Sequence, residues 1–430
     1  MFARHPNLLW LNKQLSILHY LCLVFLAVYY AYPLLFGIMP RKLQLEDENS
    51  FVIMGVADPQ IEGNHKIEAN GFFKGTLDLW GNDLFLRHLV HMNQFWGQPD
   101  AMILLGDLVS FQHLDNEEFN KRAKRLKKIT GAKNFWQVGN SSLPARTFEN
   151  GNIPVWTIAG NHDIGYGCES SDAQISKWEQ AMGPVNWVSH FNVSKFPVRV
   201  IGINSLSLDD VQFYDANPSD IINSKSFSSL GILALSKEAR DAWQFLFDIA
   251  LEPSIPTILF THVPLYKPAN VCVDEPRIVR QLDFRVKSQN HLSYNTTMKI
   301  FELIPSIKLV LSGHDHMGCD YEHPNGAIEH TLPSAMGYFG GNIGFVKLIA
   351  TNDVLTESSK NTPSVVTFLI QKLIGQRWKK ASLKQSKFSS DIYATYTLSH
   401  GGPSYIWWAL HISVCVLTIL RLLVISLQHI

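Results

Sequence analysis

Apolar residues follow two different patterns along this chain. Two long stretches, 15–38 and 405–427, are almost continuously apolar, whereas between them short apolar runs alternate with segments in which apolar residues recur at helical spacing. The first stretch contains no Asp, Glu, Lys or Arg, and the second contains only Arg421. Apolar stretches of this length are long enough to cross a bilayer. We therefore predict one transmembrane helix near each terminus.

Both stretches are expected to remain in the mature protein. The first is followed by Pro40-Arg41-Lys42 rather than by a small-x-small cleavage site, which favours a signal anchor. For the second, a GPI-attachment signal is the alternative, but the polar spacer of such signals is missing. Arg421 lies close enough to the end to snorkel. Two spans place residues 1–14 and the C-terminus on one side and the intervening domain on the other, and the flanking basic residues do not decide which side is which.

The segment between the two spans has the pattern of a single α/β domain over residues 51–350. Its short apolar, β-branched runs have the length of buried strands: Phe51–Ala57, Ala101–Leu105, Val155–Ala159, Val198–Ile203, Thr257–Phe260, Ile307–Leu311 and Phe345–Ile349. Helical spacing occurs between several of them, at Asp83–Phe95, Glu117–Ile129 and Lys237–Leu251. Residues 351–404 are expected to connect this domain to the second span. Within them, Val365–Lys380 turns from apolar to basic, and it either lies on a membrane surface or packs on the domain as a helix.

Composition excludes several classes of protein. Hydrophobic residues make up 46% and charged residues 17%, which is enough apolar material for a sizeable core and argues against disorder. Lys and Arg together number 37, as do Asp and Glu, so the formal net charge is zero. Nucleic-acid binding depends chiefly on neutralising phosphates, and a neutral chain makes it a poor expectation.

Five of the predicted strands end in polar residues: Asp58-Pro59-Gln60, Gly106-Asp107, Gly160-Asn161-His162-Asp163, Thr261-His262 and Gly313-His314-Asp315-His316. Ligands bind at the carboxyl ends of strands in open α/β sheets. Carboxylate and amide oxygens mixed with imidazoles suit a pair of divalent cations, and Asp107 is placed to bridge both. Alone, Asp58-Pro59-Gln60 is more often a turn, Gly106-Asp107 is a common turn, and Thr261-His262 is more often a buried histidine than a ligand. The other two motifs are stronger signals. All five in this order predict a two-metal hydrolytic site.

The five cysteines are too few for a disulfide scaffold. Cys22 and Cys415 lie in the predicted spans, which leaves Cys168, Cys272 and Cys319 for at most one bridge. A bridge between Cys272 and Cys319 is one interpretation, because both follow predicted metal-ligand loops. Three buried or free thiols are the other.

The ordered motifs from Asp58 to His316 resemble those of the calcineurin-like metallophosphoesterases. The resemblance covers nearly the whole segment between the spans and implies a two-sheet αββα sandwich flanked by helices. Closer features resemble the endoplasmic-reticulum phosphodiesterases that remove an ethanolamine-phosphate side branch from a mannose of GPI anchors. These features are the anchor at each end, the first motif, and the segments Gly160–Gly165, Thr261–Leu265 and Ser288-Gln289-Asn290. Ala57–Glu62 and Gly106–Phe119 are most similar to the fungal proteins that act on the second mannose.

The resemblance implies a set of metal ligands. One metal would be held by Asp58, Asp107 and His316, and the other by Asp107, Asn161, His262 and His314. Gln60 stands where many relatives have histidine, and it is either a weak oxygen ligand or lies behind the metal with water in its place. A carboxamide is a harder ligand than imidazole, so the metal pair is expected to be manganese rather than zinc.

The resemblance also implies roles around the metals. The cations would lower the pKa of a bound water, and His162 would donate a proton to the leaving alkoxide or stabilise it. Asp163 either orients His162 or caps the following turn. Ser110 replaces an acid that is common in the superfamily. Asp209, Asp210 and Glu275 are candidates for binding the ethanolamine ammonium group.

The resemblance further implies an endoplasmic-reticulum membrane protein with a lumenal catalytic domain, acting on a GPI glycolipid or GPI-anchored glycoprotein and supporting export of such proteins. Contact with a cargo receptor is part of this expectation. Three glycosylation sequons, at Asn140, Asn192 and Asn295, suit a lumenal domain. The alternatives are a membrane phosphoesterase acting on another lipid head group, which the motifs do not separate from the first, and a non-catalytic cargo adaptor that keeps the fold.

Overall fold

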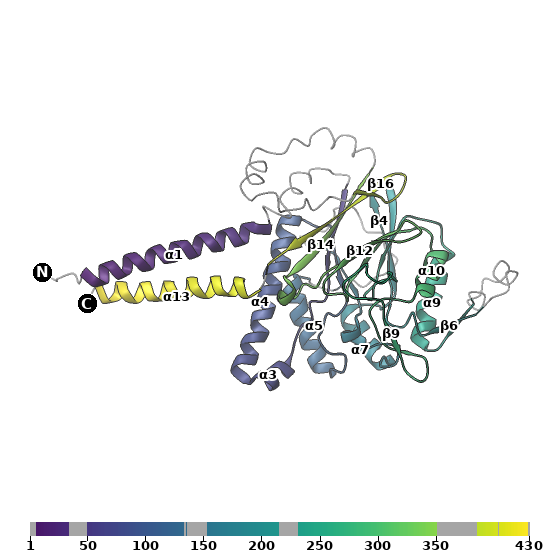
Figure 1. Ribbon diagram of the computed structural model, residues 1–430, viewed down its shortest axis with the longest axis horizontal. Helices are drawn as coiled ribbons and strands as arrows, with labels where there is room; N and C mark the ends of the chain where they lie inside the picture. The colour runs from purple at the N-terminus through teal and green to yellow at the C-terminus, as the bar shows by residue number, and fades with distance from the viewer. Residues whose placement is uncertain are drawn as a thin grey trace.

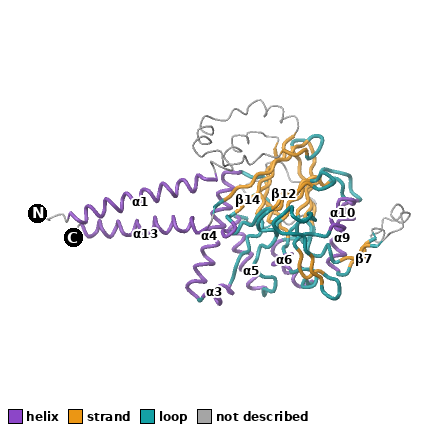
Figure 2. Tube along the Cα trace, in the orientation of Figure 1, coloured by secondary structure: helices purple, strands orange, loops and turns teal. Residues whose placement is uncertain are grey.

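The computed structural model describes residues 6–33, 50–132, 135, 153–214, 231–350, 385–402 and 404–428. Within these residues, an α/β domain carries a stalk of two long helices that run side by side away from it (Figure 1). The strands gather in the middle of the domain, and most of the remaining helices lie around them (Figure 2). The expected fold class, a two-sheet sandwich with one apolar helix near each end of the chain, is confirmed.

Two six-stranded mixed sheets form the centre of the domain. The first has the order β15-β16-β14-β1-β2-β3 and the second the order β12-β13-β11-β8-β5-β4. The strands of the first sheet are β1 Ser50–Val56, β2 Ala101–Leu105, β3 Val155–Ile158, β14 Asn342–Ala350, β15 Gln385–Lys387 and β16 Ile392–His400. Those of the second are β4 Trp187–Val193, β5 Phe196–Gly202, β8 Thr257–Phe260, β11 Ile307–Ser312, β12 Cys319–Glu322 and β13 Ile328–Thr331. Two short hairpins are added by β6 Val211–Phe213 with β7 Ile232–Ala234 and by β9 Ile278–Arg280 with β10 Val286–Gln289.

The strands that precede the polar motifs run parallel to one another within each sheet. β1 pairs in parallel with β2, and β2 with β3. In the second sheet β8 lies between β5 and β11, again in parallel. Because parallel strands end at the same edge of a sheet, the residues that follow β1, β2 and β3 emerge together, as do those that follow β8 and β11.

The two sheets are held together by an apolar core between them. Alternate residues of β1 divide between two cores: Phe51 and Ile53 face the other sheet, whereas Val52 and Met54 pack in the cluster that includes the helices. Phe51 stacks on Phe191 of β4 with ring centroids 3.9 Å apart. Since both faces of the central strands are covered, their sequences are continuously apolar rather than alternating.

Helices cover the outer faces of the sheets. They are α3 Asn64–Asn70, α4 Phe72–Gly97, α5 Asn116–Thr130, α6 Asn161–Ile164, α7 Asp172–Met182, α9 Lys237–Ala250, α10 Tyr294–Leu303 and the short 3-10 helix η3 Gly337–Phe339. Four of the longer ones begin at a side-chain cap, which satisfies an otherwise unpaired backbone N–H: Asp115, Ser171, Ser236 and Ser293. The helices predicted at 83–95, 117–129 and 237–251 correspond to α4, α5 and α9.

The stalk consists of α1 Pro6–Pro33 and α13 Ser404–Gln428. Their segments Asn7–Tyr30 and Ser404–Gln428 are long and apolar enough to cross a membrane. The predicted second span, 405–427, matches α13. The predicted first span, 15–38, differs because α1 begins at Pro6, so residues 6–14 belong to this helix, and 34–38 lie outside the described residues.

Polar side chains pair between the two stalk helices. Tyr30 Oη lies 2.9 Å from His411 Nε2. Arg421, which was expected to snorkel towards the end of its helix, instead places Nη1 2.9 Å from His19 Nδ1 of α1. Each of these polar groups on an otherwise apolar helix therefore has a partner on the neighbouring helix.

The first sheet extends past the predicted domain boundary at residue 350. β16 pairs with β14 along its whole length, from Asn342 with His400 to Ala350 with Ile392, and β15 pairs with β16. Residues 385–400 therefore belong to the domain rather than to a connecting segment. The predicted amphipathic stretch Val365–Lys380 lies outside the described residues.

Candidate metal centre

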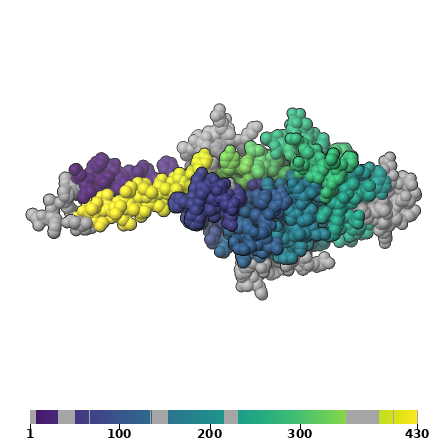
Figure 3. All heavy atoms as spheres, turned by 90° about the horizontal axis from the view of Figure 1, so that it is seen from below, coloured from purple at the N-terminus to yellow at the C-terminus, as the bar shows by residue number. Residues whose placement is uncertain are grey.

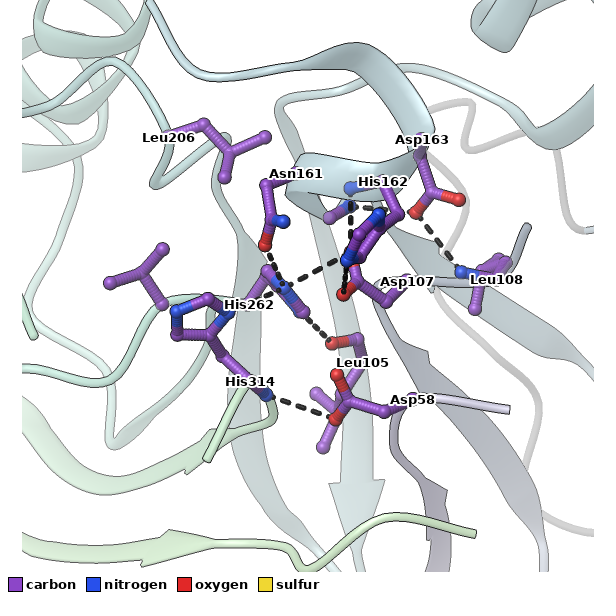
Figure 4. A network of polar contacts seen from close by, with 12 residues as sticks. Asp58, Leu105, Asp107, Leu108, Asn161, His162, Asp163, Leu206, His262 and His314 are labelled. Carbon is purple, nitrogen blue, oxygen red and sulfur yellow. Dashed lines mark hydrogen bonds and ion pairs between the residues drawn. The ribbon is translucent and has the colours of Figure 1, made fainter. Parts of the chain in front are cut away.

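The polar residues that follow five strands converge at one edge of the sandwich (Figure 4). Asp58 follows β1, Asp107 follows β2, Asn161 begins α6 after β3, His262 follows β8, and His314 and His316 follow β11. All six residues that were predicted as metal ligands lie in this one cluster. They form two groups that share Asp107.

The first group, here called the inner cluster, comprises Asp107, Asn161, His262 and His314. His262 Nε2 lies 3.1 Å from Asn161 Oδ1 and 3.3 Å from Asp107 Oδ1. His314 Nδ1 lies 3.2 Å from His262 Nε2. Ligand atoms of Asp107, His262 and His314 all lie within 4.8 Å of one another. Four donor atoms therefore surround one small volume.

Backbone carbonyls fix the orientation of the two inner histidines. His262 Nδ1 lies 2.8 Å from the Leu105 carbonyl, and His314 Nε2 lies 2.8 Å from the Gln289 carbonyl. A carbonyl only accepts, so these two nitrogens each carry a proton, and the facing nitrogens are the ones that can offer lone pairs to a metal. Burial, together with the neighbouring His262, lowers the pKa of His314 to about 4, which keeps its ring neutral. A neutral imidazole is the form that binds a metal.

The second group, here called the outer cluster, comprises Asp58, Gln60, His316 and the other carboxylate oxygen of Asp107. His316 Nε2 lies 3.6 Å from Asp58 Oδ1. Gln60 Nε2 lies 3.4 Å from both Asp107 Oδ2 and His316 Nε2. Burial alone would lower the pKa of His316, but the adjacent Asp58 carboxylate outweighs this effect and raises that pKa. The His316 side chain is 28% exposed, whereas that of His262 is completely buried.

Both clusters fit divalent cations. In the inner cluster two imidazole lone pairs face each other with an amide and a carboxylate oxygen beside them, an arrangement that only a proton or a cation relieves. In the outer cluster, Asp58 Oδ2 accepts a hydrogen bond from the His314 backbone N–H, but its buried Oδ1 has no hydrogen-bond partner among the described residues. A buried carboxylate oxygen without a donor is expensive, and a metal ion would satisfy it.

The backbone around the clusters is held in an unfavourable conformation. Asp58, Gln60, Asp107 and His314 have φ between 42° and 70°, a region that non-glycine residues rarely adopt. Gly160 must be glycine because a Cβ there would lie 2.1 Å from the Asp107 backbone nitrogen. Backbone strain of this kind persists where the surrounding structure over-determines it and gathers at functional sites.

His162 lies at the open side of the clusters. Its backbone N–H donates to Asp107 Oδ1 over 2.8 Å, and its ring Nε2 lies 3.8 Å from Asp107 Oδ2. The side chain is 41% exposed, so it can meet a substrate that approaches Asp107 from solvent.

Asp163 does not contact His162 in the described hydrogen bonds. Its buried carboxylate accepts from the backbone N–H groups of Gly160, Leu108 and Val109 over 2.7, 3.2 and 2.8 Å. Burial and the charge of Asp107 raise the pKa of Asp163, which these three donors oppose. Of the two predicted roles, the structure therefore favours the cap. The carboxylate ties the turn that carries Asn161 to the loop that carries Asp107.

Two residues near the inner cluster were not predicted as site residues. The Tyr166 hydroxyl donates to the Gln289 carbonyl over 3.1 Å and lies 3.3 Å from His314 Nε2. Burial, followed by the charge of Asp107, raises the pKa of Tyr166, so the hydroxyl keeps its proton. Gln289 lies in the segment Ser288-Gln289-Asn290, which carries part of the resemblance to the GPI-remodelling phosphodiesterases, but the sequence gives it no role. No local signal in the sequence distinguishes Tyr166 from an ordinary core aromatic residue.

Two of the three candidates for binding an ammonium group are buried and accept hydrogen bonds from other parts of the domain. Asp209 is buried and accepts hydrogen bonds from the Ser293 backbone and the Thr296 hydroxyl. Asp210 is buried and accepts from the Val286 backbone. Both carboxylates hold the interior together rather than facing a substrate. Glu275 is exposed.

The remaining sequence expectations concern modification. Cys272 and Cys319 form a disulfide, which ties the loop after His262 to the strand after His316, while Cys168 is free. Asn192 and Asn295 are exposed on β4 and α10, as glycosylation would require. Asn140 lies outside the described residues.

Comparison with known proteins agrees with this geometry. The model of the calcineurin-like phosphoesterase family matches residues 51–318. Protein TED1 of Saccharomyces cerevisiae is 25% identical over 386 residues, which cover 71% of this chain and 75% of TED1. Metallophosphoesterase 1 of Mus musculus is 28% identical over 248 residues, covering 55% of this chain and 54% of that protein.

Similarity to solved structures is weaker. A crystal structure of a dimetal phosphatase from Danio rerio has a TM-score of 0.40 and 12% identity, covering 70% of this chain and 94% of that one. The chain spans about half the length of the metallophosphoesterase 1 proteins that it matches. The family match alone includes more than half of the chain and all of the converging ligand residues. The chain therefore belongs to the calcineurin-like phosphoesterase family and is a phosphoesterase.

Proposed function

We propose that this phosphoesterase is a two-metal phosphodiesterase that removes an ethanolamine-phosphate side branch from a mannose of GPI anchors, the second mannose being favoured. The observation that carries the chemistry is the pair of ligand clusters that share Asp107, one oxygen facing each cluster. A shared carboxylate sets two cations at the short spacing used for phosphoester hydrolysis.

The inner cation would be held by Asp107, Asn161, His262 and His314, and the outer one by Asp58, Asp107 and His316. Bound there, divalent cations would neutralise phosphate charge and make a bound water more acidic. The mixture of oxygens with imidazoles, and the carboxamide of Gln60 in place of an imidazole, favours manganese over zinc. Gln60 can present its oxygen to the outer cluster after rotation of the carboxamide.

The exposure of the residues around the clusters indicates where the substrate would bind and which residue would donate a proton. The phosphodiester would lie over the outer cluster, because the His316 side chain there is 28% exposed whereas that of His262 in the inner cluster is completely buried. His162 is exposed and close to Asp107, so it is placed to give a proton to the departing alkoxide oxygen of the mannose. The products would be a GPI mannose with a free hydroxyl and ethanolamine phosphate.

The substrate assignment is supported by the resemblance of several loops to GPI-remodelling phosphodiesterases and by the pair of apolar helices that would keep the domain next to a membrane lipid. Through this activity the protein would support export of GPI-anchored proteins from the endoplasmic reticulum, and contact with a cargo receptor is part of the proposal. The presence of every expected ligand in one site, apart from the histidine that Gln60 replaces, speaks against an adaptor that has lost its chemistry.

The disulfide supports a lumenal position of the domain. Disulfides persist in oxidising compartments and are rare in the cytosol, so a Cys272–Cys319 bridge favours the lumen. The exposed sequons at Asn192 and Asn295 point the same way. With two spans, the chain ends beyond the stalk would then be cytosolic, and the protein would be a multi-pass membrane protein of the endoplasmic reticulum.

The proposal is tested with the purified full-length protein in detergent. The protein is incubated with manganese and with GPI glycans that carry ethanolamine phosphate on either the first or the second mannose, and product mass is measured. Loss of ethanolamine phosphate from the second-mannose substrate is expected. Hydrolysis of bis(p-nitrophenyl) phosphate without any change in either glycan would refute the substrate while leaving the phosphodiesterase chemistry intact.

A further inference from the structure

The first turns of α4 expose an unusual number of large apolar side chains. Phe72 and Phe73 are 79% and 78% exposed, Leu77 is 48% exposed and Trp80 is 56% exposed. Phe73, Leu77 and Trp80 lie four and three residues apart and so share one side of the helix. These four residues are here called the α4 patch. Clusters of exposed apolar residues mark sites of contact with another molecule or with a membrane.

The α4 patch is continuous with the domain end of the stalk. The Trp80 ring lies 5.8 Å from that of Trp408 at the start of α13, and a Cβ on the neighbouring Gly81 would lie 3.2 Å from the same indole. Two turns further along α4, the His88 ring lies 4.5 Å from that of Tyr30 of α1. α4 thus crosses the domain ends of both stalk helices, and its first turns extend past them (Figure 1). In the view from below, this part of the chain bulges from the domain beside α13 (Figure 3).

The depth of these aromatic residues follows from the length of α13. About 20 apolar residues are needed to cross the hydrocarbon core, and α13 has 25 residues from Ser404 to Gln428. If α13 spans the bilayer, Trp407 and Trp408 lie at its lumenal boundary, where Trp and Tyr are enriched. Tyr30 lies at the same level, because its hydroxyl is 2.9 Å from His411. Trp80 contacts Trp408 and must therefore lie near the same level.

We propose that the α4 patch rests in the interfacial layer of the bilayer that α1 and α13 cross, and that it docks the domain on the membrane. The occupant of the patch is lipid rather than protein, since the patch continues directly from the aromatic residues at the foot of the spans. Lys74, exposed between the apolar residues, can reach lipid phosphates. α4 acts as a third, non-spanning membrane contact, which prevents the domain from swinging about its stalk.

This contact also sets the position of the metal centre. The Phe339 ring lies 4.6 Å from the His316 ring of the outer cluster. The 3-10 helix η3 connects the outer cluster to the stalk. Phe339 is the last residue of η3, and Gly337 is the first. Gly337 packs against α13, since a Cβ at this position would lie 2.3 Å from the Ser404 side chain. Tyr338, between them, is 91% exposed. Docking through α4 would therefore hold the open side of the outer cluster close to the bilayer, where a lipid-linked phosphodiester lies. This last step rests on the proposed function.

Docking is tested first by depth, independently of activity. The full-length chain, with Cys22, Cys168 and Cys415 replaced by alanine, receives an environment-sensitive fluorophore on cysteine through Phe73→Cys or Leu77→Cys and is placed in lipid nanodiscs. The matched control is Leu282→Cys, because Leu282 is fully exposed on the β9–β10 hairpin away from the stalk. We expect blue-shifted emission at both patch positions and strong quenching by lipids with a spin label near the head group, but neither at 282. Emission at 73 and 77 equal to that at 282 would overturn the proposal, as would a blue shift that lipid quenchers do not affect, because that result indicates a protein occupant.

The second test measures the effect of docking on turnover of a lipid substrate. The double substitution Phe73→Asp and Leu77→Asp, compared with Leu282→Asp, is assayed on a phosphodiester lipid in nanodiscs and on soluble bis(p-nitrophenyl) phosphate. If docking buries these two apolar side chains in lipid, their loss predicts at least about a tenfold lower turnover of the lipid substrate. Turnover of the soluble substrate should be unchanged. Equal turnover of both substrates by the double variant and the wild-type protein would exclude a role of docking in substrate access. Inactivity of the wild-type protein on the soluble ester would instead refute the proposed function and leave the depth measurement standing.

Discussion

The inner and outer clusters share one carboxylate but differ in almost every physical respect. The inner cluster has one completely buried imidazole, His262, and one partly exposed imidazole, His314, both oriented by backbone carbonyls, and an asparagine oxygen 3.1 Å from the His262 ring. The outer cluster has a partly exposed histidine, His316, longer separations of 3.4 to 3.6 Å, and the carboxamide of Gln60 rather than a second imidazole.

The difference indicates that the two sites have different tasks. A preorganised set of ligands, held by backbone hydrogen bonds, binds its cation tightly, because little reorganisation is needed. An open set with a weaker donor binds less tightly but leaves coordination positions for substrate. The inner cation would then be a permanent part of the fold, and the outer one would exchange with the medium. Four substitutions test this contrast, in order of their expected effect on turnover.

Removing an inner ligand should have the largest effect. His262→Ala removes the most buried ligand of the inner cluster. Mutating a residue that only hydrogen-bonds to a metal ligand typically lowers metal affinity or activity by about 10–100-fold. Removing the ligand itself should therefore lower turnover of a soluble diester by more than about 100-fold. Bound metal, measured by mass spectrometry, should fall below one equivalent. His190→Ala on β4, half-buried and away from the clusters, is the control. Two retained equivalents of metal in His262→Ala would contradict the inner assignment.

His162→Ala should separate chemistry from metal binding. General acid catalysis contributes about 10²–10⁴-fold, so turnover of an alkyl phosphodiester should fall within that range while both metal equivalents remain. The loss should be smaller for a nitrophenyl ester, because that leaving group needs little protonation. A similar loss on both esters would remove His162 from the role of proton donor.

Gln60→His should make the two clusters more alike. Imidazole in place of the carboxamide adds a stronger ligand for the outer cation, which should raise its affinity by about tenfold or more. Titration with a chelator, followed by metal content and activity together, should show one equivalent lost early in the wild-type chain and later in Gln60→His. Simultaneous loss of both equivalents from the wild-type chain would show that the clusters do not differ in affinity.

Breaking the disulfide should have the smallest effect on turnover. Replacing Cys272 and Cys319 by alanine frees the loop after His262 and the strand after His316, and is expected to lower the free energy of unfolding by about 2–4 kcal/mol. Turnover at saturating manganese should change only a few-fold, because no ligand is removed. Chemical denaturation and a manganese titration measure the two effects. Unchanged stability would mean that the loops are held by their other contacts.

Much of the site was predictable because ligand residues are local signals. Asp107 and His262 each follow a buried run at the position where parallel strands release side chains, and the order of such motifs along the chain is visible without a structure. What links distant segments was not predictable in the same way. Tyr166 and Gln289 are 123 positions apart in the sequence, and the residues around each of them do not predict the hydrogen bond between them.

The fold shows the same division. The central strands were recognisable from continuous apolar runs, whereas β16 was not, because Ile392–His400 is flanked by sequence that reads as a connector and its pairing with β14 is set by tertiary context. Asp163 illustrates the limit for single residues. Its sequence position allowed two roles, and only the three backbone donors around it distinguish them.

The place of β16 in the first sheet bears on the timing of biogenesis. This strand lies between β14 and β15 and is separated from α13 by only three residues, so the sheet that carries Asp58 and Asp107 receives its remaining strands only after residues 385–400 have been synthesised. A nascent chain halted before residue 385 would expose the open edge of β14 to other proteins. Because β16 and the apolar helix α13 are so close along the chain, truncations that remove both should behave as folding defects rather than as the loss of an apolar helix alone.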